Sequence, residues 1–253
     1  MIEASIRYQT QGDEWLKRVL IGGGLICAGL LFGIFILPLA LFFTVNGYML
    51  EVLRRVLRGE TTNPPEWGEL ALVETTIDGL RHLAVVLPYG FAALLIAGLP
   101  AGLLLLIGAI AESGALVFLG VAVGALLYLV VVLALAFVMP VATANFVRKD
   151  SIAAGFDFGV LRTITPNRTM LKAVLIAFAV NVIMSVIVNV LGFTIVGLLA
   201  VPFVQFVFQS AIFYIWADGF ADAYEAEYGE PPITPTAASE SDTGASGSTG
   251  EAI

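Results

Sequence analysis

The charged side chains with the most regular spacing lie between residues 47 and 58. Arg54, Arg55 and Arg58 follow Glu51 along one side of a helical repeat. The other side carries apolar residues at the i, i+3, i+4, i+7 and i+8 positions, which are Met49, Val52, Leu53, Val56 and Leu57. That period is typical of an amphipathic helix, and guanidinium groups on such a helix bind lipid headgroups at a membrane surface. We therefore expect a surface helix over residues 47–58 that contacts anionic lipid headgroups or a partner protein.

A second amphipathic pattern covers residues 69–82, and its charges are mostly negative. Trp67 precedes it, and because Trp is enriched at the membrane–water interface, we expect this residue to anchor the connecting loop there. The two helices predict a surface hairpin held by ion pairs between the three arginines and Glu69, Glu74 or Asp78. Since exposed ion pairs contribute only about 0–1 kcal/mol each, burial of the apolar faces must supply most of the stability.

Amide and hydroxyl side chains recur every four residues in two later apolar segments. Asn181, Ser185 and Asn189 share one face of the first segment, and Gln205 and Gln209 share a face of the second. A hairpin turn at residues 192–193 brings Asn181 level with Gln205. One interpretation is a ladder of hydrogen bonds between the helices, and the alternative is a polar path for a small solute. No Asp, Glu, Lys or Arg lies deep in an expected span, which disfavours ion-coupled transport.

Residues for catalysis, metal binding or cofactor binding do not form a recognisable pattern. The chain has one histidine, His82, and one cysteine, Cys27, so neither a His-rich nor a Cys-rich metal site can form. Asp78, Asp157, Asp218 and Asp222 are spread over separate segments, which is more typical of a solvated surface. Acids outnumber bases by 20 to 12, so a basic nucleic-acid-binding face is absent. We expect no enzymatic activity, no cofactor and no metal.

The elements that position these residues are membrane helices. Of the 253 residues, 59% are hydrophobic and only 13% charged, whereas soluble domains have about 25% charged residues. The sequence predicts an all-α polytopic membrane bundle of about five spans, preceded by a polar lead-in over residues 1–18 and followed by a disordered acidic tail over residues 225–253. The expected spans cover residues 19–45, 83–111, 115–139, 170–191 and 194–217. A re-entrant or bent form of residues 19–45 is the alternative, but 27 residues are too few for two crossings, so a single span is favoured.

Five spans place nine of the twelve Lys and Arg residues on one side of the membrane and the three N-terminal ones on the other. The positive-inside rule then predicts that the side with nine charges faces the cytoplasm, together with the acidic tail. The expected location is the cell membrane, with the lipid bilayer as the first partner and another membrane protein or a second copy of the chain as a further one.

Several short motifs in the first third of the chain resemble one known family. Gly47-Tyr48, the LRRVLRGE segment at residues 53–60, Pro65-Glu66-Trp67 and Asp78-Gly79-Leu80 are similar to the domain of unknown function 4013 family of archaeal membrane proteins. Asp13, Trp15 and Gly22-Gly23 fit the same pattern, and the resemblance extends to about Tyr228. It implies a multi-span protein from a haloarchaeon. It implies no activity, because none is assigned to the family.

Two functions are compatible with these patterns. The first is a non-enzymatic interaction or scaffold protein embedded in the membrane, which uses Arg54, Arg55, Arg58 and the acidic tail. The alternative is a small-solute transporter or channel with a polar path between the last two spans.

Overall fold

The computed structural model describes residues 2–32 and 36–233, and this part of the chain is helical without any strand. The helices in chain order are α1 (Ile2–Gln9), α2 (Trp15–Phe32), α3 (Ile36–Leu57), α4 (Leu72–Ile110), α5 (Gly114–Lys149), the 3-10 helix η1 (Ile152–Phe156), α6 (Phe158–Ile164), α7 (Arg168–Gly192) and α8 (Ile195–Tyr228). The predicted all-α class is confirmed. Among the described residues, α4, α5, α7 and α8 are long and apolar enough to cross a membrane, which is four candidate spans in place of about five.

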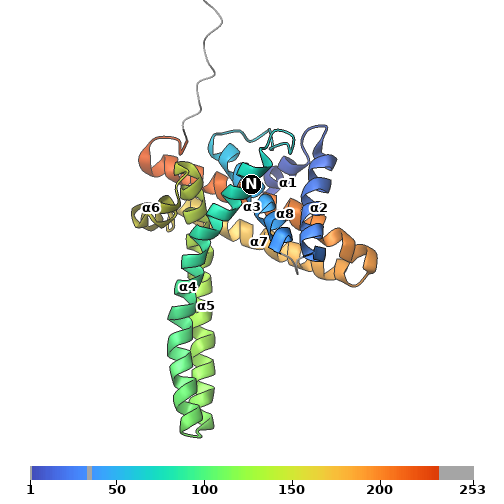
Figure 1. Ribbon diagram of the computed structural model, residues 1–253. Helices are drawn as coiled ribbons and strands as arrows, with labels where there is room; N and C mark the ends of the chain where they lie inside the picture. Colours follow the sequence, from blue (N-terminus) through green and yellow to red (C-terminus); the bar gives the residue numbers. More distant parts are fainter. Residues whose placement is uncertain (1, 33–35, 234–253) are drawn as a thin grey trace, which may run out of the picture.

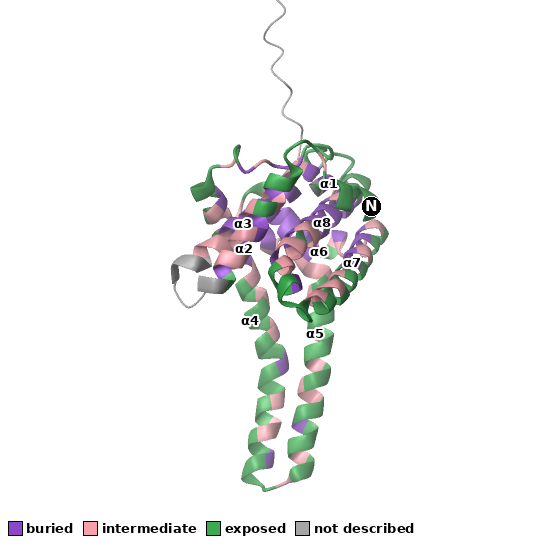
Figure 2. Ribbon diagram, turned by 90° about the vertical axis from the view of Figure 1, so that its right-hand side faces the viewer, coloured by how far each residue is buried: buried purple, intermediate pink, exposed green. Residues whose placement is uncertain are grey.

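The α4–α5 hairpin projects from a body formed by the other helices (Figure 1). The 39 residues of α4 extend for about 58 Å at 1.5 Å per residue, well beyond a hydrocarbon core of about 30 Å. Most of the hairpin surface is exposed, while the buried residues gather in the body (Figure 2). The exposed side chains are large and apolar, as at Phe91, Leu94, Leu103 and Phe118. Lipid is the environment that suits such a surface.

The apolar run at residues 19–45 is not one helix, so the expectation of a single first span is wrong. A Cβ atom added at Gly29 in α2 would lie 2.8 Å from the Phe42 ring in α3. Thirteen residues of one straight helix would separate these positions by about 20 Å, so α2 and α3 must fold back against each other. Pro38 stands in the first turn of α3, where its missing N–H group leaves no hydrogen bond unmade. This is the bent arrangement that the sequence offered as the alternative.

The two expected surface helices are parts of longer helices. Residues 47–57 belong to α3, and the Val52 and Leu53 side chains are fully buried in the protein core. Residues 72–82 and the span expected after them form the single helix α4, because a change from polar to apolar side chains does not interrupt backbone hydrogen bonding. The apolar face of α3 therefore packs on other helices, and its predicted place on a lipid surface is wrong.

Glycines allow close packing at two helix contacts. In the contact of α3 with α4, Gly47 lies against the Thr75 carbonyl oxygen and Gly79 against the Phe43 carbonyl oxygen, and neither position has room for a Cβ atom. In the contact of α2 with α8, Gly22 lies directly against the Phe206 ring. The backbones of these helix pairs can approach so closely only because these positions have no side chain.

The C-terminal end of the fold differs from the sequence expectation. Helix α8 continues to Tyr228 and ends at Gly229, whose φ of 73° is the left-handed conformation that favours glycine at a helix end. The acidic tail expected from residue 225 thus begins within α8. Ile233 packs against the hydrophobic core. Residues 234–253, which hold the rest of the predicted disordered tail, lie outside the described residues.

Candidate binding cleft

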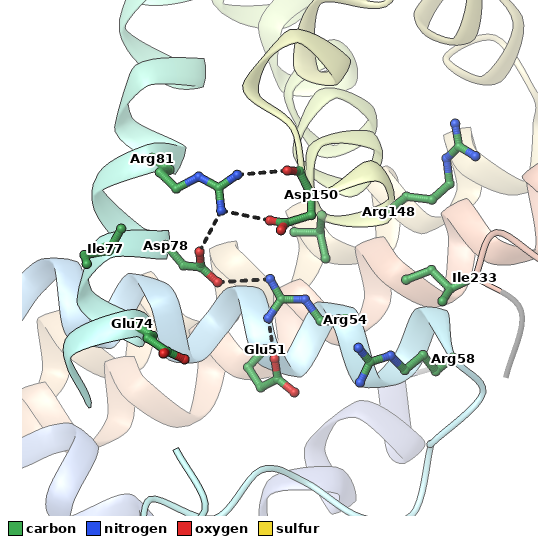
Figure 3. Close-up of a pocket in the computed structure, with 11 residues that line it drawn as sticks. Glu51, Arg54, Arg58, Glu74, Ile77, Asp78, Arg81, Arg148, Asp150 and Ile233 are labelled. Atoms are coloured by element: carbon green, nitrogen blue, oxygen red, sulfur yellow. Dashed lines mark hydrogen bonds and ion pairs between the residues drawn. The ribbon is translucent and has the colours of Figure 1, made fainter. Parts of the chain in front are cut away.

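A cleft of about 560 Å³ opens where the end of α3, the first turns of α4 and the end of α5 meet (Figure 3). The residues of α4 that line it come just before the apolar part of the α4–α5 hairpin. The charged side chains of the cleft are Arg54, Arg58, Arg81, Arg148, Glu51, Glu74, Asp78 and Asp150. Positive and negative groups are equal in number, so their positions decide what the cleft can bind.

A chain of alternating charges joins the three helices on one side of the cleft. Asp78 accepts from Arg54 at 3.0 Å and from Arg81 at 3.1 Å, so its carboxylate bridges two guanidinium groups. Arg54 also pairs with Glu51. The predicted ion pairing between α3 and the acidic segment is therefore confirmed for Arg54 with Asp78. It is also confirmed for Arg55, which lies 2.7 Å from Glu69.

Arg81 connects α4 to the end of α5. Its Nη1 donates to Asp150 Oδ1 at 2.9 Å and its Nη2 to the Asp150 carbonyl oxygen at 2.8 Å. Asp150 caps α5 with a φ of 46°, a left-handed conformation that Asp tolerates better than most residues. The fork of the guanidinium group thus binds both the side chain and the backbone of this cap. Sequence reasoning did not select Arg81, because its partner lies 69 residues away.

The ion pairs fix the charge of the groups that they join. Burial alone would lower the pKa of Arg54, but the carboxylates of Glu51 and Asp78 outweigh this and raise it. The pKa of Arg55 is likewise raised, because Glu69 and Glu51 outweigh the effect of burial. The hydrogen bond from Arg55 lowers the pKa of Glu69. These groups stay ionised at neutral pH, so this side of the cleft is internally neutralised.

The other side of the cleft holds two arginines that no carboxylate of the described residues neutralises. Arg58 is exposed and makes no ion pair within that part of the chain. Arg148 is held by neutral groups. It donates to Asn145 Oδ1 at 2.9 Å and to the Tyr224 hydroxyl at 2.9 Å, and its guanidinium lies 4.6 Å from the Tyr224 ring centroid. Figure 3 shows both side chains on the side of Ile233, away from the Arg54–Asp78–Arg81 network. We call Arg58 and Arg148 the rim arginines.

His82 lies buried below the ion pairs and connects the same three helices. Its Nδ1 is 2.9 Å from Asn46 Oδ1 in α3, and its Nε2 is 3.0 Å from the Thr143 hydroxyl in α5. A neutral imidazole with its proton on Nδ1 satisfies both contacts, because it donates to the amide oxygen and accepts from the hydroxyl. The side chain packs over the Phe146 ring and is 7% exposed. These contacts suit a structural link between helices.

Replacing Thr143 by Val should destabilise the protein by about 1–2 kcal/mol, because the buried Nε2 of His82 then lacks its hydrogen-bond partner. The unfolding midpoint in detergent measures the effect. Thr163→Val is the control, since the side chain of that half-buried threonine makes no hydrogen bond within the described part of the chain. Equal midpoints for the two variants would show that the His82 contact contributes nothing.

Trp67 is buried, so its predicted place as an anchor at the membrane interface is wrong. Only 7% of the residue is exposed. Its Nε1 donates to the Arg18 carbonyl oxygen at 3.0 Å, and its ring stacks on Tyr48 with centroids 4.6 Å apart. The neighbouring Glu66 accepts from the buried Arg18 guanidinium at 2.6 Å. The loop after α3 is thereby fixed to α2 and α3.

A comparison with protein families matches residues 30–193 to the family described as protein of unknown function DUF4013. The match covers more than half of the chain. The chain belongs to the DUF4013 family. No curated protein and no solved structure matches this DUF4013 chain.

The matched range contains all the charged residues of the cleft, which lie in α3, α4 and α5 or, for Arg58 and Asp150, directly after α3 and α5. It is narrower than the resemblance drawn from the sequence motifs, which also included Asp13, Trp15, Gly22-Gly23 and the chain up to Tyr228. For the matched motifs of this DUF4013 protein the structure gives physical reasons. Gly47 and Gly79 permit the contact of α3 with α4, and Glu66 and Trp67 hold the loop between them.

The predicted polar ladder does not form in this DUF4013 protein. Asn181, Ser185, Asn189 and Gln209 are exposed and Gln205 is half-buried. Between α7 and α8, the described residues show no side-chain hydrogen bond of this set, and Asn189 donates instead to the Ser185 carbonyl oxygen of its own helix at 2.7 Å. The face of α7 that meets α8 carries small and apolar side chains, among them Ala173, Ala177 and Val180. The antiparallel hairpin is as predicted, but Asn181, which follows Ala177 by one helical turn, lines a cavity of about 190 Å³ with Ile212 and Trp216 of α8 instead of bonding to that helix.

Candidate metal ligands do not converge either. Within residues 2–32 and 36–233, no group of three or more His, Cys, Asp or Glu side chains could hold a metal ion. The carboxylates of the cleft are engaged mainly with arginines. The arginines left over therefore suit the binding of an anionic group better than that of a cation.

Proposed function

We propose that this DUF4013 protein is a non-enzymatic interaction protein of the membrane, and that its cleft binds an acidic segment of a partner protein. One observation carries the proposal. The rim arginines, Arg58 and Arg148, face an open cleft without a carboxylate partner among the described residues, whereas the arginines opposite are neutralised by Asp78, Glu51 and Asp150. Guanidinium groups bind carboxylates through paired hydrogen bonds. Arg148 is also held by Tyr224 and Asn145, so it is ordered before a partner arrives.

The charge distribution supports a cytoplasmic cleft in the cell membrane. Residues 111–114 and 192–194, which connect the helices of the two hairpins, contain no Lys or Arg. With α2 and α3 folded back on each other, the three N-terminal cations lie at the same ends of the helices as the other nine. The positive-inside rule then assigns all twelve Lys and Arg residues to the cytoplasmic side. We also propose a haloarchaeal source, because only three of the twelve cations are Lys and acids predominate.

The transporter alternative has less support. It requires a polar path between α7 and α8, but the cavity of about 190 Å³ beside Asn181 is otherwise lined by apolar side chains, among them Phe178, Ile212 and Trp216. No second function is proposed.

The proposal is tested by crosslinking in native membranes with an affinity tag at the N-terminus, followed by mass spectrometry. The combined variant Arg58→Ser with Arg148→Gln should lower the recovery of acidic partner segments at least fivefold, because both rim charges are gone. Arg162→Ser is the matched control, since Arg162 is exposed, makes no ion pair among the described residues and lies outside the cleft. Recovery that is equal for both variants would contradict the proposal, provided that both unfold at the temperature of the native protein.

A further inference from the structure

The cleft lies beside the point where the described chain ends. Ile233 lines the cleft between the rim arginines and packs against the hydrophobic core, and the preceding Pro232 is buried (Figure 3). The chain that follows is therefore anchored at the cleft. Its point of departure is fixed by packing.

The following segment carries charges that complement the rim. Residues 234–253 contain Glu240, Asp242 and Glu251 and no Lys, Arg or His. The rim offers two guanidinium groups that no carboxylate of the described residues neutralises. Carboxylate and guanidinium groups form the strongest common class of hydrogen-bonded ion pair in proteins.

The segment is also long enough to return to the rim. Glu240 is seven residues beyond Ile233, so the chain between them can extend for at most about 25 Å. For comparison, a random-coil peptide of seven residues has a mean end-to-end distance of about 15 Å. Tethering of this kind gives an effective concentration in the millimolar range, so even weak contacts to the rim are substantially populated.

We propose that the acidic segment 234–253 binds the rim arginines of its own chain through Glu240 and Asp242, and so competes with an external acidic partner. The inference rests on the proposed function, because it assigns a regulator to the same cleft. A partner must then displace the segment before it can occupy the rim. At low partner concentration the segment occupies the rim arginines, and a partner that presents more carboxylates displaces it.

The docking is tested on the full chain by measuring the distance between two spin labels. The labels are attached at Val73→Cys, an exposed position beside the cleft residue Glu74, and at Ser241→Cys, with Cys27→Ala removing the native thiol. We expect a narrow distance distribution, which broadens at least twofold in the variant Glu240→Gln with Asp242→Asn and also in Arg58→Ser. Arg162→Ser should leave it narrow. A distribution that is equally broad in the native chain and in all variants would overturn the proposal.

A second measurement separates this proposal from the proposed function. Removing residues 234–253 should raise the recovery of crosslinked partner at least threefold at limiting partner concentration. A narrow spin-label distance distribution, together with no partner whose recovery depends on the rim arginines, would support the docking of the segment and refute the partner function. A broad distance distribution, together with a partner whose recovery depends on the rim arginines but does not change on truncation, would refute the docking and support the partner function.

Discussion

Glu66→Ala should destabilise the protein by about 3 kcal/mol. Arg18 is 1% exposed and its Nη2 lies 2.6 Å from Glu66 Oε1, so the substitution takes the Glu66 carboxylate away from a buried guanidinium. Breaking a buried ion pair by removing one partner costs about 3–5 kcal/mol. We expect the low end of that range because 30% of the Glu66 side chain is exposed. The free energy of unfolding in mixed micelles of a mild and a denaturing detergent measures the change.

Two controls test whether the loss of stability comes from the Arg18–Glu66 ion pair. Glu3→Ala removes an exposed carboxylate that pairs with the exposed Arg7 of α1, and it should leave the unfolding free energy within error. The double variant Arg18→Met with Glu66→Ala should be less destabilised than the sum of its single variants, because the ion pair is then lost only once. Additive effects would show that the two side chains do not interact.

Gly79→Ala should have an effect of similar size. The new methyl group would overlap the Phe43 carbonyl oxygen, and because the obstacle is backbone, α3 and α4 must move apart to accommodate it. Overpacking of a fitted contact costs about 1–3 kcal/mol and sometimes more. We expect about 3 kcal/mol, since the displacement would also lengthen the Arg54–Asp78 ion pair next to it. Thermal unfolding of the purified protein is the measurement.

Gly90→Ala is the matched control in the same helix. A Cβ atom at Gly90 meets no other atom within 4 Å, and Ala is favoured over Gly in a helix by about 0.5–1 kcal/mol. Its unfolding temperature should therefore stay the same or rise slightly. If Gly79→Ala behaved like this control, the close contact of α3 with α4 would not determine stability.

The sequence predicted which residues share a helix face more reliably than what that face contacts. The repeat from Met49 to Leu57 marked an apolar face correctly, and the opposite charges at Arg54 and Asp78 indicated their ion pair. Lipid and the interior of a protein both accept apolar side chains, however, so the pattern could not tell a surface helix from a buried one. The same ambiguity applied to Trp67, whose indole N–H group finds a partner at a membrane interface or on a backbone carbonyl.

Residues that depend on distant partners had no local signal. His82 contacts Asn46 and Thr143 across 36 and 61 residues, and nothing in its own neighbourhood indicated that link. Asn181 and Asn189 shared a face as predicted, but the four-residue repeat does not specify the direction in which that face points. In α7 the same repeat begins with Ala173 and Ala177, whose small side chains let α8 approach, whereas Asn181 and Asn189, further along the helix, are exposed.

The clamp of Arg81 on Asp150 has a consequence for the biogenesis of the protein. It closes a loop of 69 residues that contains nearly the whole α4–α5 hairpin. During synthesis, Arg81 emerges from the ribosome long before Asp150, and the two can meet only after both helices have inserted and the second has returned to the side of the first. A hairpin that stalls half-inserted, or inserts in a shifted register, keeps these charges apart. The contacts of Arg81 with Asp150 thus stabilise the hairpin only after both of its helices are fully inserted.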